Sequence, residues 1–250
     1  MEIGEIISNS FKYPLSDANS FLRYAALFLL LVVPSLIMTI GALAKNTAVT
    51  GVGFILMLAC YVIFVLILEG YLLSVMKEGI SQSALIPPYQ IGKNIVDTFK
   101  TWVLSFVYSI VPVVIITILF FVLFGSLQSA TPQNMNAISA NMAIIGIVAL
   151  ILYVIFGILL SIGTLRLANT DSLSEGLNFS AVIEDLKGIG IGKFIVTDIV
   201  MGIIGGAILG FGALLILIPL VGFIIYVFFL VPFVSLAIAY GLGLLYSEVA

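Results

Sequence analysis

Six long apolar stretches run through this sequence, and they limit its possible folds more than any other feature. A helix needs about 20 mainly apolar residues to cross a hydrocarbon core about 30 Å thick, and each stretch is long enough. The expected spans are Tyr24–Leu43, Val52–Val75, Trp102–Phe124, Met142–Leu165, Phe194–Leu217 and Gly222–Leu245. Only a turn at Pro219 and Gly222 separates the last two. We therefore predict an all-α, polytopic helical membrane protein with about six transmembrane helices in a single domain, residues 1–250.

Composition excludes a water-soluble fold. Only 8% of the residues are charged and 62% are hydrophobic, whereas soluble domains carry about 25% charged residues. Histidine is absent and Cys60 is the only cysteine, so the commonest metal ligand and any intrachain disulfide are missing. The net charge is -3 and the cations form no cluster. We therefore expect the lipid bilayer to be a partner of the chain, and nucleic acid not to be one.

The cations are unevenly distributed among the predicted loops. Of the nine Lys and Arg residues, only Lys45 falls on one side of the predicted spans. The others share the opposite side: Lys12, Arg23, Lys77, Lys93, Lys100, Arg166, Lys187 and Lys193. Cytoplasmic loops retain Lys and Arg, so we predict a plasma-membrane protein with both termini in the cytoplasm. The uncharged loop Gly125–Ala140 is then expected to face outward. The first residues lack the features of a secretory signal, so we expect no processing.

Three short segments resemble one another and predict an internal repeat. Residues 5–12, 93–100 and 180–187 are each a candidate amphipathic helix that ends in lysine and precedes a pair of spans. Corresponding break points are expected at Pro34, at Pro112 and at Gly205 with Gly206. Chance resemblance between apolar sequences is the alternative. The repeat units would cover approximately residues 1–80, 89–170 and 178–248, related by an axis along the membrane normal.

Small residues form a stripe on the fifth predicted span. Gly202, Gly206 and Gly210 follow one another at four-residue steps, which allows close backbone approach in lipid. The sixth span offers a counterpart in three residues: Ser235, Ala239 and Gly243. We interpret the stripe as a helix-packing contact between these two spans within one chain. A homodimer seam is the alternative.

Two carboxylates, Glu69 and Asp198, lie within predicted spans. An ionisable residue inside a membrane is a functional-site hypothesis by default, so both are candidates for an intramembrane polar role. Each lies toward the cytoplasmic end of its span, where it can meet water or an arginine such as Arg166 or Arg23. A proton or ion relay is the alternative.

Motifs for catalysis and for cofactor binding are missing from the sequence. The glycine-rich run from Lys187 to Lys193 lacks the spacing of a phosphate-binding loop, and Phe194 replaces the Ser or Thr that would hold magnesium. We interpret this run as a joint that leads into the fifth span. The sequence contains no nucleophilic triad, zinc spacing or nucleophile elbow. We therefore predict no catalytic residue, no cofactor or metal site, and no enzymatic activity.

Several short motifs are similar to those of a known family. They are Phe11–Pro14, Gly70-Tyr71, Ile86-Pro87-Pro88-Tyr89, Leu177-Asn178-Phe179 and Leu245–Glu248. Over nearly its whole length the chain resembles a prokaryotic membrane family known as domain of unknown function 4013. Ile86 stands where the family has leucine, Pro88 is inserted, and Asn178 occupies an acidic position. The resemblance implies a multi-pass membrane protein without an established activity, and it assigns no functional residue.

Three functional hypotheses follow. The first is a non-catalytic membrane component, such as an assembly, scaffold or accessory subunit, because small-residue stripes are present and reactive groups are not. Its partner would be another membrane protein or a second copy of the chain. The alternative is a transporter or channel for a small or lipidic substrate, suggested by the repeats and by Glu69 and Asp198. A membrane-embedded enzyme ranks third, because no set of reactive residues can be assembled.

Overall fold

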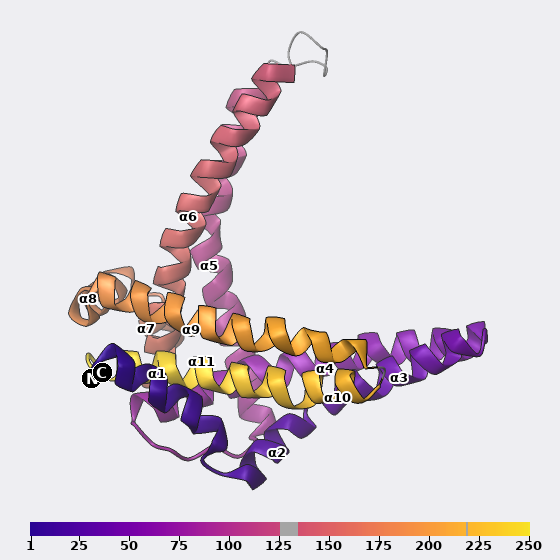
Figure 1. The fold of residues 1–250 in the computed structure, drawn as a ribbon. Helices are drawn as coiled ribbons and strands as arrows, with labels where there is room; N and C mark the ends of the chain where they lie inside the picture. The colour runs from indigo at the N-terminus through magenta and orange to yellow at the C-terminus, as the bar shows by residue number, and fades with distance from the viewer. Residues whose placement is uncertain (126–134, 219) are drawn as a thin grey trace.

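The structure is a computed structural model that describes residues 1–125, 135–218 and 220–250. Every regular element among these residues is a helix (Figure 1). The elements are α1 (Ile3–Lys12), η1 (Tyr13–Leu15), α2 (Ala18–Ala26), α3 (Leu29–Leu43), α4 (Thr47–Ile80), α5 (Ile91–Phe124), α6 (Met135–Thr170), α7 (Leu173–Gly176), α8 (Phe179–Ile189), α9 (Ile191–Gly212), η2 (Ala213–Leu217), α10 (Val221–Ile225), η3 (Tyr226–Leu230) and α11 (Val231–Tyr246). The predicted turn at Pro219 and most of the loop predicted from Gly125 to Ala140 lie outside the described residues.

Five helical segments among the described residues are long and apolar enough to cross a membrane: α4, α5, α6, α9 with η2, and α10 to α11. A sixth candidate arises only if α2 and α3 together form one span, with a bend of 49° between them. Alone, the 15 residues of α3 measure about 22 Å, less than a hydrocarbon core of about 30 Å. The chain is therefore a multi-pass membrane protein with five or six candidate spans.

All three predicted break positions are wrong. Pro34 lies inside the continuous helix α3 and Pro112 inside the continuous helix α5. Gly205 and Gly206 lie inside the continuous helix α9. Membrane helices tolerate proline because neighbouring groups satisfy the backbone. The first predicted span instead bends between α2 and α3. The segment 93–100 is the beginning of α5 and not a separate amphipathic helix, whereas α1 and α8 are separate.

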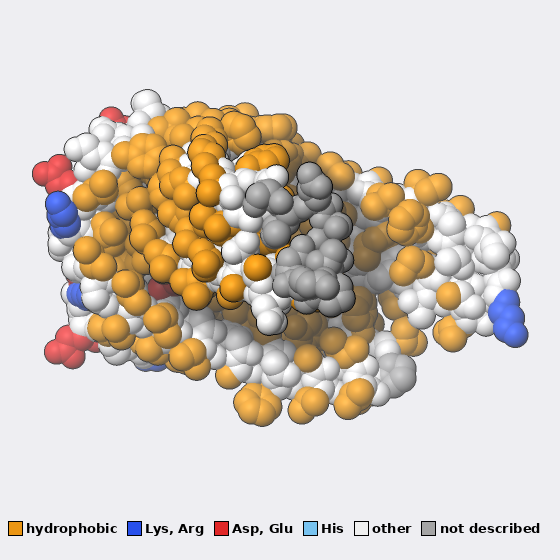
Figure 2. All heavy atoms as spheres, turned by 90° about the horizontal axis from the view of Figure 1, so that it is seen from above, with side chains coloured by type: hydrophobic (Ala, Val, Ile, Leu, Met, Phe, Trp, Pro, Cys, Tyr) orange, Lys and Arg blue, Asp and Glu red, His pale blue; other side chains and the backbone are white. Residues whose placement is uncertain are grey.

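Three helical arms extend from a common base (Figure 1). One arm contains α3 and α4, another contains α5 and α6, and the third contains α9 to α11. The arm of α5 and α6 points away from the other two, while α1, α7, α8 and both termini lie at the base. Figure 2 shows most of the visible charged side chains at one end of the molecule, a cation at the opposite end, and hydrophobic side chains over the surface between them. The arms therefore present apolar surface, as lipid-facing helices must.

Close helix crossings hold the arms to the base. At the crossing of α4 and α5, the Gly70 amide donates to the Thr98 hydroxyl at 2.9 Å, and that hydroxyl donates to the Leu66 carbonyl at 2.9 Å. The Thr98 hydroxyl thus lies between the Gly70 amide and the Leu66 carbonyl, two groups that are four residues apart on α4. At the crossing of α4 and α11, a Cβ on Gly243 would lie 2.9 Å from the Gly79 Cα. Both crossings require glycine because backbone lies against backbone.

Gly190 forms the predicted joint before the fifth span. It separates α8 from α9 and has a φ of 91°, a conformation that favours glycine. The N-terminus of α8 is capped by Asn178, whose side-chain oxygen accepts from the Ala181 amide at 3.2 Å. The chain therefore turns at the base before it enters the third arm.

Ion pairs connect elements at the base. Lys77 of α4 contacts Asp171, which follows α6, at 2.6 Å, and Lys93 lies 3.7 Å from the same carboxylate. Lys193 of α9 contacts Glu248 at 2.6 Å, and the amino group of Met1 contacts Glu248 at 2.7 Å. The two ends of the described chain therefore lie against each other.

One of these ion pairs predicts a pH dependence of stability. The hydrogen bond from Lys77 holds the pKa of the Asp171 carboxyl below its ordinary value. Because the folded pKa is the lower one, the contribution of Asp171 is complete above the unfolded pKa of about 4 and is lost as pH falls through the folded pKa. We expect the melting temperature in detergent to fall slightly between pH 5 and pH 3. Asp171→Asn should show a smaller fall, and identical pH profiles would contradict the prediction.

Candidate functional site

A groove between α6 and α9 contains one of the two carboxylates predicted within spans. Its volume is about 440 Å³, and α6 and α9 diverge away from the base (Figure 1). The lining is mostly apolar: Tyr153, Val154, Gly157, Ile158, Ser161, Phe194, Ile195, Asp198 and Ile199. Asp198 lies about 10 Å along α9 from its first residue, at about 1.5 Å per residue. The groove therefore places a carboxylate between the apolar surfaces of two candidate spans.

Asp198 has no ion pair or hydrogen bond within the described part of the chain. Arg166, one of the two arginines suggested as its partner, instead lies 2.7 Å from Glu175 and 2.8 Å from Asp185. Arg23 lies on α2 and lines a different cavity. A carboxylate within a membrane span is costly unless it meets water, a proton or a cation. The groove thus offers a hydrogen-bond acceptor or a negative charge to any molecule or helix that binds in it.

The three glycines predicted for helix packing share the face of α9 that carries Asp198, because each follows at a four-residue step. A Cβ added at Gly202, Gly206 or Gly210 would meet no atom of residues 1–125, 135–218 or 220–250 within 4 Å. The interpretation that this stripe packs against the sixth span is therefore wrong. α9 turns another face to α11, where a Cβ on Gly205 would lie 2.9 Å from a valine side chain.

The residues proposed as the counterpart of the stripe contact other elements. The Ser235 hydroxyl lies 2.7 Å from the Tyr24 hydroxyl of α2. Ala239 is buried in the core of the base, and Gly243 lies against α4. These small residues of α11 therefore serve contacts within the chain, while the glycine stripe of α9 stays open.

Glu69, the other predicted carboxylate, lies on a different arm. It is half-buried on α4 beside the indole of Trp102 on α5. Neither the groove nor the cavity under α2 is lined by Glu69. The structure does not bring Glu69 and Asp198 together, so the geometry gives no support to a relay between them.

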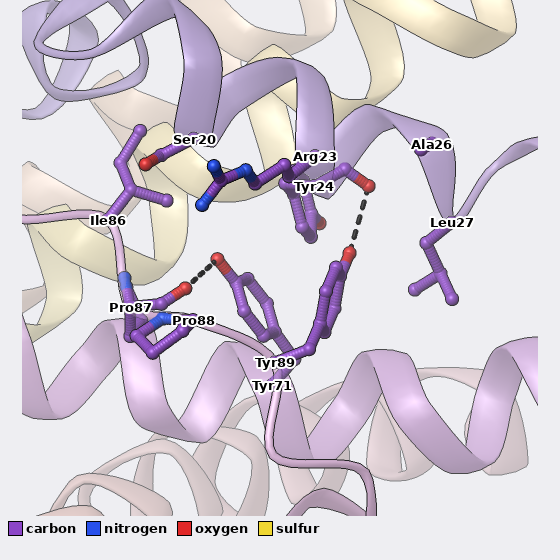
Figure 3. Close-up of a pocket in the computed structure, with 10 residues that line it drawn as sticks. All are labelled: Ser20, Arg23, Tyr24, Ala26, Leu27, Tyr71, Ile86, Pro87, Pro88 and Tyr89. Carbon is purple, nitrogen blue, oxygen red and sulfur yellow. Dashed lines mark hydrogen bonds between the residues drawn. The ribbon is translucent and has the colours of Figure 1, made fainter.

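A second cavity of about 670 Å³ lies under α2 (Figure 3). Its residues come from α2 and the residue that follows it, from α4, and from the segment between α4 and α5: Ser20, Arg23, Tyr24, Ala26, Leu27, Tyr71, Ile86, Pro87, Pro88 and Tyr89. The rings of Tyr24 and Tyr71 stack at 4.9 Å, and those of Tyr71 and Tyr89 lie 4.6 Å apart. The cavity therefore has an aromatic wall.

Hydrogen bonds fix the tyrosines of this wall. The Tyr71 hydroxyl donates to the Pro87 carbonyl and the Tyr89 hydroxyl to the Tyr24 carbonyl, each at 2.9 Å (Figure 3). Burial raises the pKa of the Tyr89 phenol above its ordinary value, so its hydroxyl stays protonated and keeps donating. The tyrosine wall is thus neutral and ordered. The positive charge among the residues that line the cavity comes from Arg23.

Sequence reasoning missed this cavity. In the sequence, Tyr71 and Tyr89 stand out only as parts of motifs, and Arg23 only as a cation for topology and as a possible partner of an intramembrane carboxylate. The available signal was that aromatic residues lie close in sequence to the cytoplasmic ends of predicted spans, where amphipathic rings are common. Nothing in the sequence shows that α2 covers the segment before α5, because that contact joins residues 65 positions apart.

Comparison with known proteins identifies a family. The family model described as "Protein of unknown function (DUF4013)" matches residues 53–218, which is more than half of the chain. The matched region includes the groove residues of α6 and α9 and, in the second cavity, Tyr71 and Tyr89. No curated protein and no solved structure matches the chain. The chain therefore belongs to the DUF4013 family of proteins of unknown function.

Proposed function

We propose that this protein is a non-catalytic membrane component, an accessory or assembly subunit, that docks one transmembrane helix of another membrane protein in the groove between α6 and α9. The observation that carries the proposal is the open face of α9. Asp198, Gly202 and Gly206 lie along this face, and no other described part of the chain fills it. Small residues let a second helix approach closely, and an acceptor at the base of the groove orients it.

Charge favours a different protein over a second copy as the occupant. From Phe194 to the last residue of the sequence there is no Lys or Arg. A symmetric seam between two copies of α9 would place Asp198 opposite Asp198, which is unfavourable in a low-dielectric environment. A partner helix with a lysine, an arginine or a hydrogen-bond donor at the matching depth satisfies the carboxylate. A partner of this kind is therefore the proposed occupant.

The proposal includes six crossings with both termini in the cytoplasm of the cell. Contact between Met1 and Glu248 supports an even number of crossings, because residues in contact lie on the same side of a membrane. An even number requires α2 and α3 to complete one span. The cations at the base support a cytoplasmic location for that end.

A threefold repeat is also part of the proposal. Ser10 of α1 lies against Gly241 of α11, and Thr98 of α5 lies against Gly70 of α4. Ser10 and Thr98 each precede the aligned lysine of their segment by two residues. The start of one unit thus contacts a glycine on the last helix of another. This correspondence supports common descent of at least two of the three units.

Transport of a lipidic substrate is the second candidate, and the same groove favours it. The groove is open beside apolar surfaces, and Ser161 and Tyr153 supply polar groups near Asp198. A head group could bind there while its chains stay in the bilayer. Native mass spectrometry of protein from its own membranes separates the two functions: a stoichiometric protein partner supports docking, and one retained lipid supports transport.

Gly206→Leu tests the docking face. A Cβ at this position meets no atom of the described residues within 4 Å, so we expect the leucine to occupy the open face of α9, folding to be unchanged and the co-purified protein to be lost. Ala207→Leu is the matched control, because it is exposed at the same depth on a neighbouring face of α9. The measurement is the partner-to-bait ratio in mild detergent.

Three outcomes of this experiment would contradict the docking proposal. They are an unchanged partner ratio in Gly206→Leu, an equal loss in Ala207→Leu, and wild-type protein that carries no other protein. Asp198→Asn adds a test of charge. It should lower the ratio if the partner offers a cation, and a wild-type dimer that persists in Asp198→Asn would favour a second copy as the occupant.

A further inference from the structure

We propose that the cavity under α2 binds an anionic phospholipid of the inner leaflet, with the phosphate of its head group on Arg23. This site is separate from the groove between α6 and α9, and it does not depend on the proposed docking function; its placement in the inner leaflet rests on the proposed topology.

Arg23 differs from most cations of the base. Ion pairs within the chain occupy Lys77, Lys93, Lys100, Arg166 and Lys193. Arg23 forms no ion pair among the described residues, and its guanidinium extends over the cavity (Figure 3). The nearby Asp17 accepts hydrogen bonds from the Ser20 hydroxyl at 2.6 Å and the Asn19 amide at 3.0 Å. Arg23 therefore has its planar set of donors available for a phosphate, which arginine binds through two oxygens.

The remaining lining suits an uncharged, partly apolar part of a ligand. Tyr71 and Tyr89 already donate their hydroxyl protons to backbone carbonyls, so their rings and hydroxyl oxygens face the cavity as a neutral wall. Leu27 and Pro88 add apolar surface. None of the residues that line the cavity is acidic. An anion with an attached apolar group therefore fits the cavity, whereas a cationic ligand would be repelled by the positive charge of Arg23.

The position of α2 favours a phospholipid, and not a free anion in solution, as the ligand that carries the phosphate. α2 leads from the base into the first arm, with a bend of 49° before α3. Leu22 next to Arg23 is 45% exposed and Leu29 at the start of α3 is 44% exposed, so apolar surface continues from the cavity edge to the arm. Arginine near a helix end holds its charge at the membrane interface. The cavity is thus placed where phospholipid head groups lie.

A lipid titration tests the proposal. Delipidated protein in detergent is titrated with phosphatidylglycerol and, separately, with phosphatidylcholine of the same acyl chains, and bound lipids are counted by native mass spectrometry. We expect the first phosphatidylglycerol to bind about tenfold more weakly to Arg23→Gln than to wild type, a difference of about 1.4 kcal/mol, because the variant loses the charge-assisted hydrogen bonds to the phosphate. Phosphatidylcholine should bind both proteins weakly and equally.

Two further variants control the experiment. Lys187→Gln removes a cation that is also exposed and unpaired among the described residues but lies on α8, so it should bind phosphatidylglycerol like wild type. Ala26→Phe keeps Arg23 but fills the cavity, so it should lose the lipid. Equal binding by wild type and Arg23→Gln would overturn the proposal, as would an equal loss in Lys187→Gln. Competition by soluble glycerol 3-phosphate at the same concentration as the lipid would show a site for free phosphate and would also overturn it.

Discussion

Gly70→Ala is expected to leave little folded protein in the membrane. An alanine Cβ at this position would overlap the Asn94 carbonyl oxygen of α5 and would lie 2.6 Å from its carbonyl carbon. Backbone atoms cannot rotate away, so α4 and α5 would have to separate, and the hydrogen bonds of Thr98 at this crossing would be lost. We expect a loss of more than about 3 kcal/mol in the free energy of unfolding, at the upper end of overpacking effects.

The same substitution elsewhere on α4 provides the control. A Cβ at Gly51 would meet nothing within 4 Å, and Gly→Ala in an exposed helix position stabilises by about 0.4–1 kcal/mol. The two variants should therefore change stability in opposite directions. Unfolding by sodium dodecyl sulfate in mixed micelles, followed by circular dichroism, measures both. Equal stability of Gly70→Ala and Gly51→Ala would show that the crossing of α4 and α5 can accommodate a methyl group at position 70.

Arg166→Met is expected to have the second largest effect. Arg166 donates to Glu175 at 2.7 Å and to Asp185 at 2.8 Å, and Asp185 also accepts from the Tyr246 hydroxyl at 2.6 Å. The Asp185 side chain is only 13% exposed, so loss of the arginine would leave a largely buried carboxylate with one hydroxyl partner. We expect a loss of about 3 kcal/mol, the lower end for breaking a buried ion pair.

Two comparisons test this value in the same mixed-micelle assay. Lys77→Met breaks an ion pair whose side chains are 46% and 44% exposed, so its loss should stay below about 1 kcal/mol. The double variant Arg166→Met with Asp185→Leu should lose less than the sum of the single variants, because the stranded carboxylate is gone. Strict additivity would mean that Arg166 acts through packing and not through Asp185.

Hydropathy predicted the candidate spans because the length of an apolar run is a local property. The joint at Gly190 was also predictable, since glycine next to glycine-rich sequence favours a change of direction. The continuity of α5 through Pro112 could not be predicted from the sequence. Whether a proline interrupts a membrane helix depends on the groups that surround it in the folded protein, and these are not neighbours in the sequence.

The face of α9 that packs against the chain could not be chosen from the sequence either. Gly205 and the stripe that contains Gly206 both satisfy the small-residue pattern. Beyond Asp198, all remaining residues of α9 are glycine or apolar on every face. In water, a polar face would have distinguished the inside from the outside of the helix. In lipid, both faces are apolar, so only the structure shows that Gly205 is covered and Gly206 is open.

The position of α11 has a consequence for the order of assembly during synthesis. Its glycines Gly241 and Gly243 fit against Ser10 of α1 and Gly79 of α4, two elements that leave the ribosome long before it. Until α11 arrives, those surfaces lack the helix that covers them in the finished protein. The base can thus close only after α11 has left the ribosome, and a chain that stops before α11 would present an unfilled seam to the quality-control proteases of the membrane.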